Sequence, residues 1–442
     1  MKDKSATVSK KTKQAEETPT KWEWVETSVW TDSMLGALER GVKGGKWFSL
    51  IDKVYRVKTL RAAWRKVKAN DGAPGIDQVS IDDYERHTES NLKRLSDKLK
   101  EGTYEPRAVR RTWIPKPGRA EKRPLGIPTV EDRVVQMALK MVLEPIFEEG
   151  FASRSYGFRP RRGTKDALRQ VDRLLKEGYR WAVDADLKGY FDTIDHEILM
   201  AEVEKKVTDG RVLELIRSFL TCEVVDGDKS YVPERGTPQG GVISPLLANI
   251  FLDPLDHMME EQGFEMVRYA DDFVVLCRTE EEANDALERV RRWTEEVGLT
   301  LHPEKTKLVD ESTGSFDFLG YRFKQGMKFP SRKAEGRFLS KIKEKTPRNS
   351  GYSLKTIIND LNRTIRGWYE YFKHSHFNVF DDMDGSTRRR LRAILRKRNN
   401  LSGPPTTLDN RRWPNAYFAN AGLFSMAKAR RVELESLRKD NH

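Results

Sequence analysis

Apolar residues recur every three or four positions through the first hundred residues, the spacing of one face of an amphipathic helix. The pattern runs from residue 30 to residue 100 and is interrupted at 70–77 by a run dense in Asn, Asp, Gly and Pro. These residues favour turns, so we expect an N-terminal helical extension from which a loop projects at 70–77. Residues 1–29 are polar, rich in Lys and Thr and without periodicity, which predicts a disordered basic lead-in.

After residue 104, apolar and polar residues alternate, and the three- to four-residue spacing of a helix is lost. Residues 104–128 alternate and carry five prolines, which suits short strands joined by a loop. Helical spacing returns over 130–147, and strand-like and helical stretches then alternate, which predicts an α+β fold with a mainly antiparallel sheet. The predicted strands lie near 181–187, 222–232, 265–277 and 316–323, and the predicted helices near 163–177, 195–220, 244–262 and 280–298.

The pattern becomes helical again beyond residue 350, which indicates a separate α-helical domain. Within it, residues 387–398 place three apolar side chains on one side of a helix and seven cations, with no acid, around the rest. A solvated helix face is the alternative, but this density of cations favours contact with phosphate groups. Residues 399–410 contain the run Gly-Pro-Pro and predict a linker, followed by a short aromatic and basic tail over 411–442.

Composition narrows the class of partner. The chain has 442 residues, enough for two to four domains, and carries 81 Lys and Arg against 68 Asp and Glu. The net charge of +13 and a pI near 9.4 indicate a polyanionic partner, nucleic acid first. No apolar run approaches the roughly 20 residues that a membrane span needs, so we expect an intracellular protein. Two cysteines, Cys222 and Cys277, provide neither a disulfide framework nor a cysteine zinc site.

Two acidic segments carry the candidate chemistry. Asp271 and Asp272 stand between two strand-like stretches, and strand period places Asp184 and Asp186 on one face of another strand. A solvated turn would explain the first pair alone, because Asp is a common turn residue. Carboxylates from two strands are, however, the oxygen ligands that Mg²⁺ prefers beside substrate phosphates, and two such ions could drive an in-line phosphoryl displacement.

Two loops complete the candidate site. Residues 235–245 form a glycine-rich loop followed by an apolar helix, and paired glycines allow a ligand to approach the backbone closely, although a tight structural turn is the alternative. Residues 110–123 carry six cations and one acid, a composition that could clamp a triphosphate.

Taken together, these motifs resemble those of the group II intron reverse transcriptases, also called maturases. The resemblance runs from about residue 30 to the C-terminus. It implies a right-hand polymerase fold, with fingers, palm and an α-helical thumb, and template-directed DNA synthesis on RNA. The matching segments are the loop at 72–77, the fingers and palm motifs at 123–128, 155–160, 184–192 and 236–249, Tyr-Ala-Asp-Asp at 269–272, Phe-Leu-Gly-Tyr at 318–321, and the thumb motif at 367–372.

The resemblance also implies roles for individual residues. Asp186 and Asp271, with the backbone carbonyl of Leu187, would hold two Mg²⁺ ions, for which Mn²⁺ could substitute, and Asp272 would assist catalysis. Asp184 would be a supporting residue. Phe191 would close the sugar pocket against a 2′-hydroxyl. The nucleotide contacts would be Arg110, Lys116, Arg123 and Gln239, and the primer grip would be Phe318, Leu319 and Gly320. For RNA contact the basic helix offers Arg388, Arg389, Arg392, Arg396 and Lys397.

By this resemblance the fingers and palm should span 101–330 and the maturase-specific thumb 331–398, with no endonuclease domain in 399–442. The implied partners are intron RNA, an RNA template with a DNA primer, target DNA and deoxynucleoside triphosphates. We expect a cytoplasmic protein that associates with the nucleoid when it acts on DNA.

Three other functions compete with this interpretation. A splicing cofactor with an idle polymerase site is opposed by the intact Asp186, Asp271 and Asp272. An RNA-dependent RNA polymerase is opposed by Phe191, because that enzyme needs room for the ribose hydroxyl. A free-standing reverse transcriptase used in DNA repair or phage defence is hardly distinguished by the protein sequence.

Overall fold

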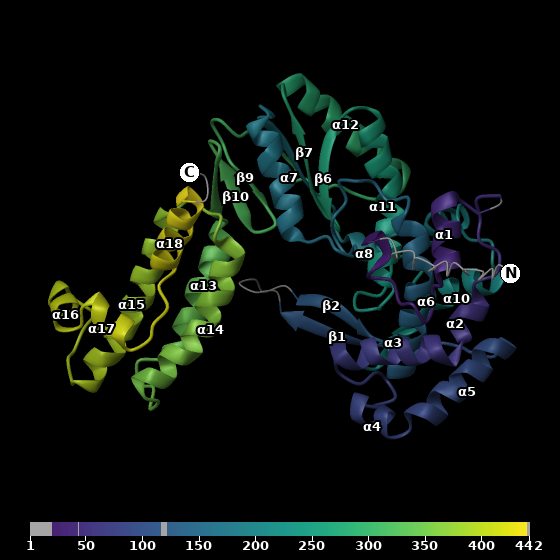
Figure 1. Cartoon of the computed structure of the whole chain (residues 1–442), viewed down its shortest axis with the longest axis horizontal. Coiled ribbons are helices and arrows are strands. Elements are labelled where there is room, and N and C mark those ends of the chain that lie inside the picture. The colour runs from purple at the N-terminus through teal and green to yellow at the C-terminus, as the bar shows by residue number, and fades with distance from the viewer. Residues whose placement is uncertain (1–19, 43, 116–121, 440–442) are drawn as a thin grey trace, which may run out of the picture.

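The computed structural model describes residues 20–42, 44–115 and 122–439, in which three sheets and their helices form a right-hand shape (Figure 1). A group of helices at the C-terminal end lies across an open space from the N-terminal helices and the first hairpin, and strands of the other two sheets lie above that space (Figure 1). Within these residues no helix is both long enough and apolar enough to cross a membrane.

The N-terminal region is helical, as the spacing of its apolar residues predicts. The structure corrects one expectation there and adds a contact to the predicted loop. Residues 20–29 are not disordered, because Trp22, Val25 and Val29 are buried in the main hydrophobic core, while residues 1–19 lie outside the described residues. The loop at 70–77 is tied down, since Arg110 donates to the Pro74 carbonyl oxygen at 2.5 Å. The elements are η1 (Thr20–Trp22), α1 (Asp32–Arg40), α2 (Ile51–Tyr55), α3 (Val57–Asn70), α4 (Ile81–Arg86) and α5 (Thr88–Glu101).

A four-stranded sheet forms the fingers. Its order is β2-β1-β4-β5, and all of its pairs are antiparallel except β1 with β4. The helix that follows β2 starts at the N-cap Thr129, whose hydroxyl accepts from the Asp132 amide, and buries its apolar residues in the main core. The elements are β1 (Val109–Pro115), β2 (Lys122–Ile127), α6 (Val130–Glu148), β4 (Val224–Asp226) and β5 (Lys229–Tyr231).

The palm is an antiparallel sheet of order β6-β7-β3-β8, which confirms the α+β prediction. Residues alternate between its two faces, so Phe273 and Val275 enter the main core while Val274 and Leu276 enter a second core against α7. The strands are β3 (Trp181–Asp186), β6 (Glu265–Tyr269), β7 (Asp272–Cys277) and β8 (Lys307–Asp310), and the helices are α7 (Thr164–Lys176), α8 (Tyr190–Thr193), α9 (His196–Glu204), α10 (Gly210–Leu220), α11 (Ser244–Glu261) and α12 (Glu280–Glu296).

The thumb contains more of the chain than the sequence pattern indicates. Trp413, Phe418 and Met426 lie buried in the same core as α14 and α15, so the predicted linker and tail contain three helices of this domain between residues 407 and 439. A three-stranded sheet connects the palm to the thumb. The elements are β9 (Phe316–Phe318), β10 (Tyr321–Lys324), β11 (Met327–Pro330), α13 (Arg332–Lys345), α14 (Leu354–Phe372), α15 (Asn378–Arg398), α16 (Thr407–Arg412), α17 (Asn415–Asn420) and α18 (Met426–Lys439).

Candidate active site

The palm sheet brings the two acidic segments together. β3 and β7 pair in a register that sets Asp186 directly opposite Asp272, and Asp271 lies in the turn just before β7. Asp184, two residues before Asp186, shares its face, as predicted. Like charges directly opposite each other in a sheet are destabilising, so this arrangement calls for a cation.

The raised pKa values of these carboxyl groups also indicate that a cation is needed. Burial, reinforced by Asp271 and Asp186, raises the pKa of Asp272 to about 7. Burial, reinforced by Asp272, also raises the pKa of Asp184 to about 7. Burial raises the pKa of Asp271 above its ordinary value as well, and Asp186 adds to the rise. Each carboxyl thus resists carrying its charge until a cation compensates it.

The only cation seen to pair with Asp186 in the described residues is Lys305, whose ammonium forms an ion pair with its carboxylate. No group of three or more acidic, histidine or cysteine side chains in that part of the chain is arranged to hold a metal by itself. Mg²⁺ is commonly bound by one or two carboxylates together with substrate phosphates, so the donor set of Asp186 and Asp271 fits that ion.

A cavity of about 490 Å³ opens beside these carboxylates. Asp186, Leu187 and Asp271 line it, as do Phe191 and Gln239. Leu187 thus lies where the resemblance expects a backbone ligand, while its side chain is buried. Asp272 does not line this cavity, which fits the predicted auxiliary position.

Two aromatic rings meet at the wall of the cavity. Phe191 belongs to α8, and Phe158 contacts it edge to face, with 6.5 Å between ring centroids. Phe158 also lines the cavity and is 44% exposed, so its ring is available to a bound molecule. The cavity wall where a sugar pocket is expected therefore has a second aromatic residue, for which the sequence predicted no separate role.

The glycine-rich loop closes against the segment that carries Phe191. The Thr237 amide donates to the Phe191 carbonyl oxygen at 2.7 Å, and Gln239 donates from its side chain to Asp192 at 3.1 Å. Gly236 has φ +89°, and a Cβ atom there would lie 2.8 Å from the Phe191 carbonyl oxygen. Gly236 is needed for packing, as the structural interpretation of this loop expects. Gln239, Gly240 and Gly241 line the cavity, and approach of a ligand to them stays a prediction.

The structure separates the three predicted fingertip cations. Arg123 is exposed and lines the cavity. Arg110 does not line the cavity, and its guanidinium donates instead to the Pro74 carbonyl oxygen. Its neighbour Arg111 lies close enough to favour the charged form of Asp192. Lys116 lies outside the described residues.

The predicted primer grip is the turn between β9 and β10. Phe318 is 1% exposed and belongs to the core, so it cannot touch a primer directly. Leu319 and Gly320 form the turn with φ +49° and +82°. The Leu319 amide donates to the Asp272 carboxylate, and Tyr371 of the thumb donates to the Leu319 carbonyl oxygen at 2.7 Å. This turn therefore links the acidic cluster to the thumb.

The basic helix α15 divides the predicted RNA-binding residues into two groups, which corrects the expectation for two of them. Arg392 is buried and donates to the Trp413 carbonyl oxygen at 3.1 Å, and Arg396 pairs with Asp409 at 2.8 Å. These two arginines hold the C-terminal helices in place. Arg388 is half-buried near Asp384, whereas Arg389 and Lys397 are exposed.

Comparison with known proteins agrees with this geometry. The family of reverse transcriptases (RNA-dependent DNA polymerases) matches residues 114–323, and the maturase-specific domain of group II introns matches residues 336–408. Protein YkfC of Escherichia coli (strain K12) is 32% identical over 350 residues, which cover 70% of this chain and 91% of that protein.

Two further matches cover a smaller share of the chain. The group II intron-encoded protein LtrA of Lactococcus lactis subsp. cremoris is 40% identical over 196 residues, which cover 44% of this chain and 32% of LtrA. This chain therefore spans about a third of that relative. A solved partial Cas6-RT-Cas1–Cas2 complex is 25% identical, covers 56% of this chain and 42% of that chain, and superposes with a TM-score of 0.36. The chain belongs to the group II intron reverse transcriptase (maturase) family, and it is an RNA-directed DNA polymerase.

Proposed function

We propose that the protein adds deoxynucleotides to the 3′-hydroxyl of a DNA primer on an RNA template, with Asp186 and Asp271 as the ligands of two Mg²⁺ ions. The observation that carries this proposal is the meeting of the two acidic segments at a cavity whose wall is Phe191. When bound, such ions activate the attacking hydroxyl and stabilise the leaving oxygen. Mn²⁺, with similar oxygen ligands, is expected to substitute.

The surrounding residues position the incoming nucleotide. Phe191 lies beneath its sugar and leaves no room for a 2′-hydroxyl, with Phe158 supporting the ring. Arg123 reaches its phosphates, and Gln239 lies beside the base pair that forms. Leu319 and Gly320 present the primer end, held by the contact of their turn with Tyr371.

A second activity, binding of intron RNA to assist splicing and mobility, is proposed for the thumb. The match to the maturase-specific domain supports it. So do exposed cations on α15 and α16, since Arg389, Lys397 and Arg411 make no ion pair within the described part of the chain. A basic surface without acidic partners is free to neutralise phosphates. Target DNA would be bound during mobility.

Asp271→Ala tests the metal site. Primer extension on an RNA template should fall to background, because one of the two ligand carboxylates is removed, while binding of the same primer and template should stay within about twofold. Asp285→Ala, which removes a surface carboxylate paired with Arg289 on α12, is the control and should extend normally. Extension that survives in Asp271→Ala would show that the metals bind elsewhere.

A further inference from the structure

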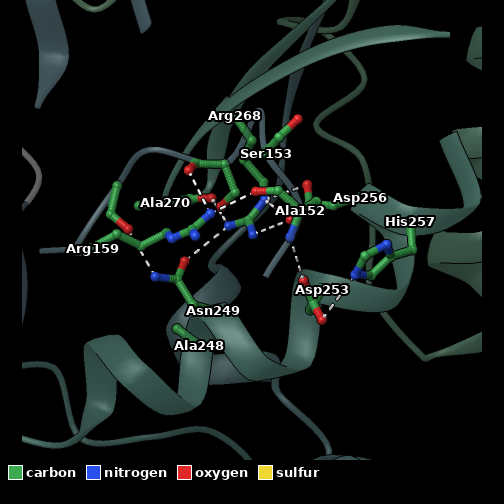
Figure 2. A network of polar contacts seen from close by, with 12 residues as sticks. Ala152, Ser153, Arg159, Ala248, Asn249, Asp253, Asp256, His257, Arg268 and Ala270 are labelled. Carbon is green, nitrogen blue, oxygen red and sulfur yellow. Dashed lines mark hydrogen bonds and ion pairs between the residues drawn. The ribbon is translucent and has the colours of Figure 1, made fainter. Parts of the chain in front are cut away.

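A buried arginine lies directly behind the catalytic turn. Arg268 on β6 is 0% exposed and reaches α11, from which Asn249 and Asp256 face it (Figure 2). The guanidinium donates through Nε to Asp256 Oδ1 at 2.7 Å, and Nη2 also bonds to that carboxylate. A buried cation therefore has a matched counter-ion, which explains why it is tolerated.

The remaining arm of the same guanidinium holds the turn itself. Nη1 donates to the carbonyl oxygen of Ala270 at 2.9 Å and to Asn249 Oδ1 at 3.0 Å (Figure 2). Ala270 is the residue immediately before Asp271. All three nitrogens of Arg268 are thus engaged, two with the counter-ion and one with the turn and its neighbour.

Ala270 needs such support because its backbone conformation is unfavourable. Its φ is +60°, in the left-handed region, where a residue with a Cβ atom is strained. A glycine would adopt this conformation without strain, but the chain has alanine here. The surrounding contacts must therefore impose the turn on Ala270.

Residues 154–157 also pack against the turn that carries Ala270. The amide of Tyr156 donates to the Arg268 carbonyl oxygen at 2.8 Å, so residues 154–156 run beside β6 like an extra strand. At Gly157 a Cβ atom would lie 2.2 Å from the Ala270 nitrogen. Asn249 donates to the Gly157 carbonyl oxygen at 2.8 Å, so one amide side chain fixes both this segment and Arg268.

We propose that Arg268, Asn249 and Asp256 are positioning residues for the polymerase reaction, which hold Ala270 in its left-handed conformation and thereby aim the Asp271 carboxylate at the metal ions. This inference rests on the proposed metal site, and it adds the buried residues that set the geometry of that site. None of the three residues lines the nucleotide cavity, so each acts only through the turn.

The shape of the guanidinium is essential to this role. A planar fork can hold Asp256 with one edge while it reaches Ala270 and Asn249 with another, which a lysine ammonium cannot reproduce. Positive charge alone would be supplied equally well by lysine. Arg268→Lys therefore separates geometry from charge.

The test compares two variants that each remove one ion pair from β6. Arg268→Met with Asp256→Leu replaces the buried pair by apolar side chains, a change that buried pairs often tolerate in stability. Arg154→Met with Glu265→Leu removes the other pair, whose atoms lie 2.8 Å apart and which does not touch the turn. Primer extension is measured against Mg²⁺ and against deoxynucleotide concentration, with thermal unfolding measured alongside.

In the first variant the Mg²⁺ concentration for half-maximal extension should rise about 10- to 100-fold, with kcat lowered, while the KM for the deoxynucleotide changes less than about threefold. The Arg154 and Glu265 variant should match the wild type. Arg268→Lys should behave like the first variant, because it retains charge without the fork. A folded first variant with the wild-type Mg²⁺ requirement would overturn the proposal, as would full rescue by lysine.

If the first variant does not fold, Asn249→Ala decides the question, because it leaves the ion pair intact. It should raise the Mg²⁺ requirement severalfold at unchanged deoxynucleotide KM, and an unchanged Mg²⁺ requirement would refute the proposal. Failure of the metal site itself looks different: Asp271→Ala would remain active, whatever the Arg268 variants do.

Discussion

Phe191 sits at the wall of the nucleotide cavity with Phe158 edge to face behind it. Phe191→Ala should admit ribonucleotides, because the ring that fills the space of the 2′-hydroxyl is gone. The preference for deoxynucleotides should fall by about 10- to 100-fold, as when a pocket loses its steric barrier. The ratio of kcat/KM for the two nucleotide types checks this.

Two further phenylalanines serve as comparisons. Phe158→Ala should reduce the same preference by a smaller factor, because Phe191 remains but loses its support. Phe377→Ala removes an exposed ring of the thumb and should leave sugar selection unchanged. Unaltered selection in Phe191→Ala would remove this residue as the gate.

Asp184 gives a pH dependence with a defined sign. Its pKa is about 7 in the folded protein, chiefly through burial, against about 4 in an unfolded chain. Above pH 7 the carboxyl is charged in both the folded and the unfolded state, and burying this charge destabilises the folded state. Below about pH 4 the carboxyl is neutral in both states, so this destabilisation is absent. Asp184→Asn should therefore stabilise the metal-free protein by at most about 4 kcal/mol above pH 7, and this gain should vanish as the pH falls toward 4.

Urea unfolding in the presence of a chelator, repeated across that pH range, measures the gain. Asp310→Asn is a suitable control, because hydrogen bonds from Ser312 lower the pKa of Asp310 in the folded protein. That substitution should destabilise instead. A gain for Asp184→Asn that is the same at every pH would show that its charge is not the cause.

The sequence identifies catalytic residues better than it identifies their neighbours. The acidic residues and Phe191 lie within short motifs, so local spacing suffices to propose them. Arg392 looks like a surface cation in its own helix, because its partner Trp413 lies 21 residues further along the chain. Lys305 and Arg268 carry no local signal that distinguishes them from other cations, since their importance arises from contacts made only after folding.

At the scale of elements, hydrophobic periodicity predicts the longer helices and the palm strands because each buries one face over several turns or residues. β8 and β11 have four residues each, too few for alternation to stand out. Their pairing is set by neighbours that lie elsewhere in the chain or across a turn, as when β8 pairs with β3.

The glycine-rich loop offers a test at this scale. Gly236→Ala should destabilise the protein by about 1–3 kcal/mol, because φ is +89° and the new Cβ atom would press on the Phe191 carbonyl oxygen. The KM for deoxynucleotides should rise, since α8 would shift. Urea unfolding and steady-state primer extension measure the two effects.

Gly227→Ala provides the matched comparison. Gly227 also has a positive φ, +62°, but its missing Cβ would meet no atom within 4 Å. This variant should show only the conformational strain, about 1 kcal/mol, and an unchanged deoxynucleotide KM. Equal effects in the two variants would mean that the contact with α8 is unimportant.

At the scale of the whole molecule, both ends of the described chain are part of folded cores. Trp22 enters the core shared by the N-terminal helices and the palm, and Phe418 enters that of the thumb. The sequence pattern predicted a disordered lead-in around Trp22 and a short tail, after a Gly-Pro-Pro linker, around Phe418. A single large aromatic residue can anchor a segment, and a composition average does not register it.

The structure of the thumb predicts which cations of α15 bind RNA and which stabilise the fold. Arg389→Gln with Lys397→Gln removes two exposed charges of α15 that have no acidic partner in the described chain, so RNA affinity should fall without loss of thermal stability. The slope of log K against log salt should decrease by about 1 for each phosphate that the protein no longer neutralises. Arg392→Met with Arg396→Met should instead lower the unfolding temperature, because these arginines hold Trp413 and Asp409.

Filter binding of a structured intron transcript over a range of salt concentrations, with thermal unfolding of each variant, distinguishes these outcomes. Lys93→Gln with Lys100→Gln makes the same charge change on α5, which lies across the open space from the thumb (Figure 1), and should leave the slope unchanged. If that variant weakens RNA binding as much as the α15 variant does, the attraction comes from the net charge of +13 and not from a thumb surface. A local surface is expected, because exposed charges separated by more than about 10 Å are largely screened from one another at moderate salt.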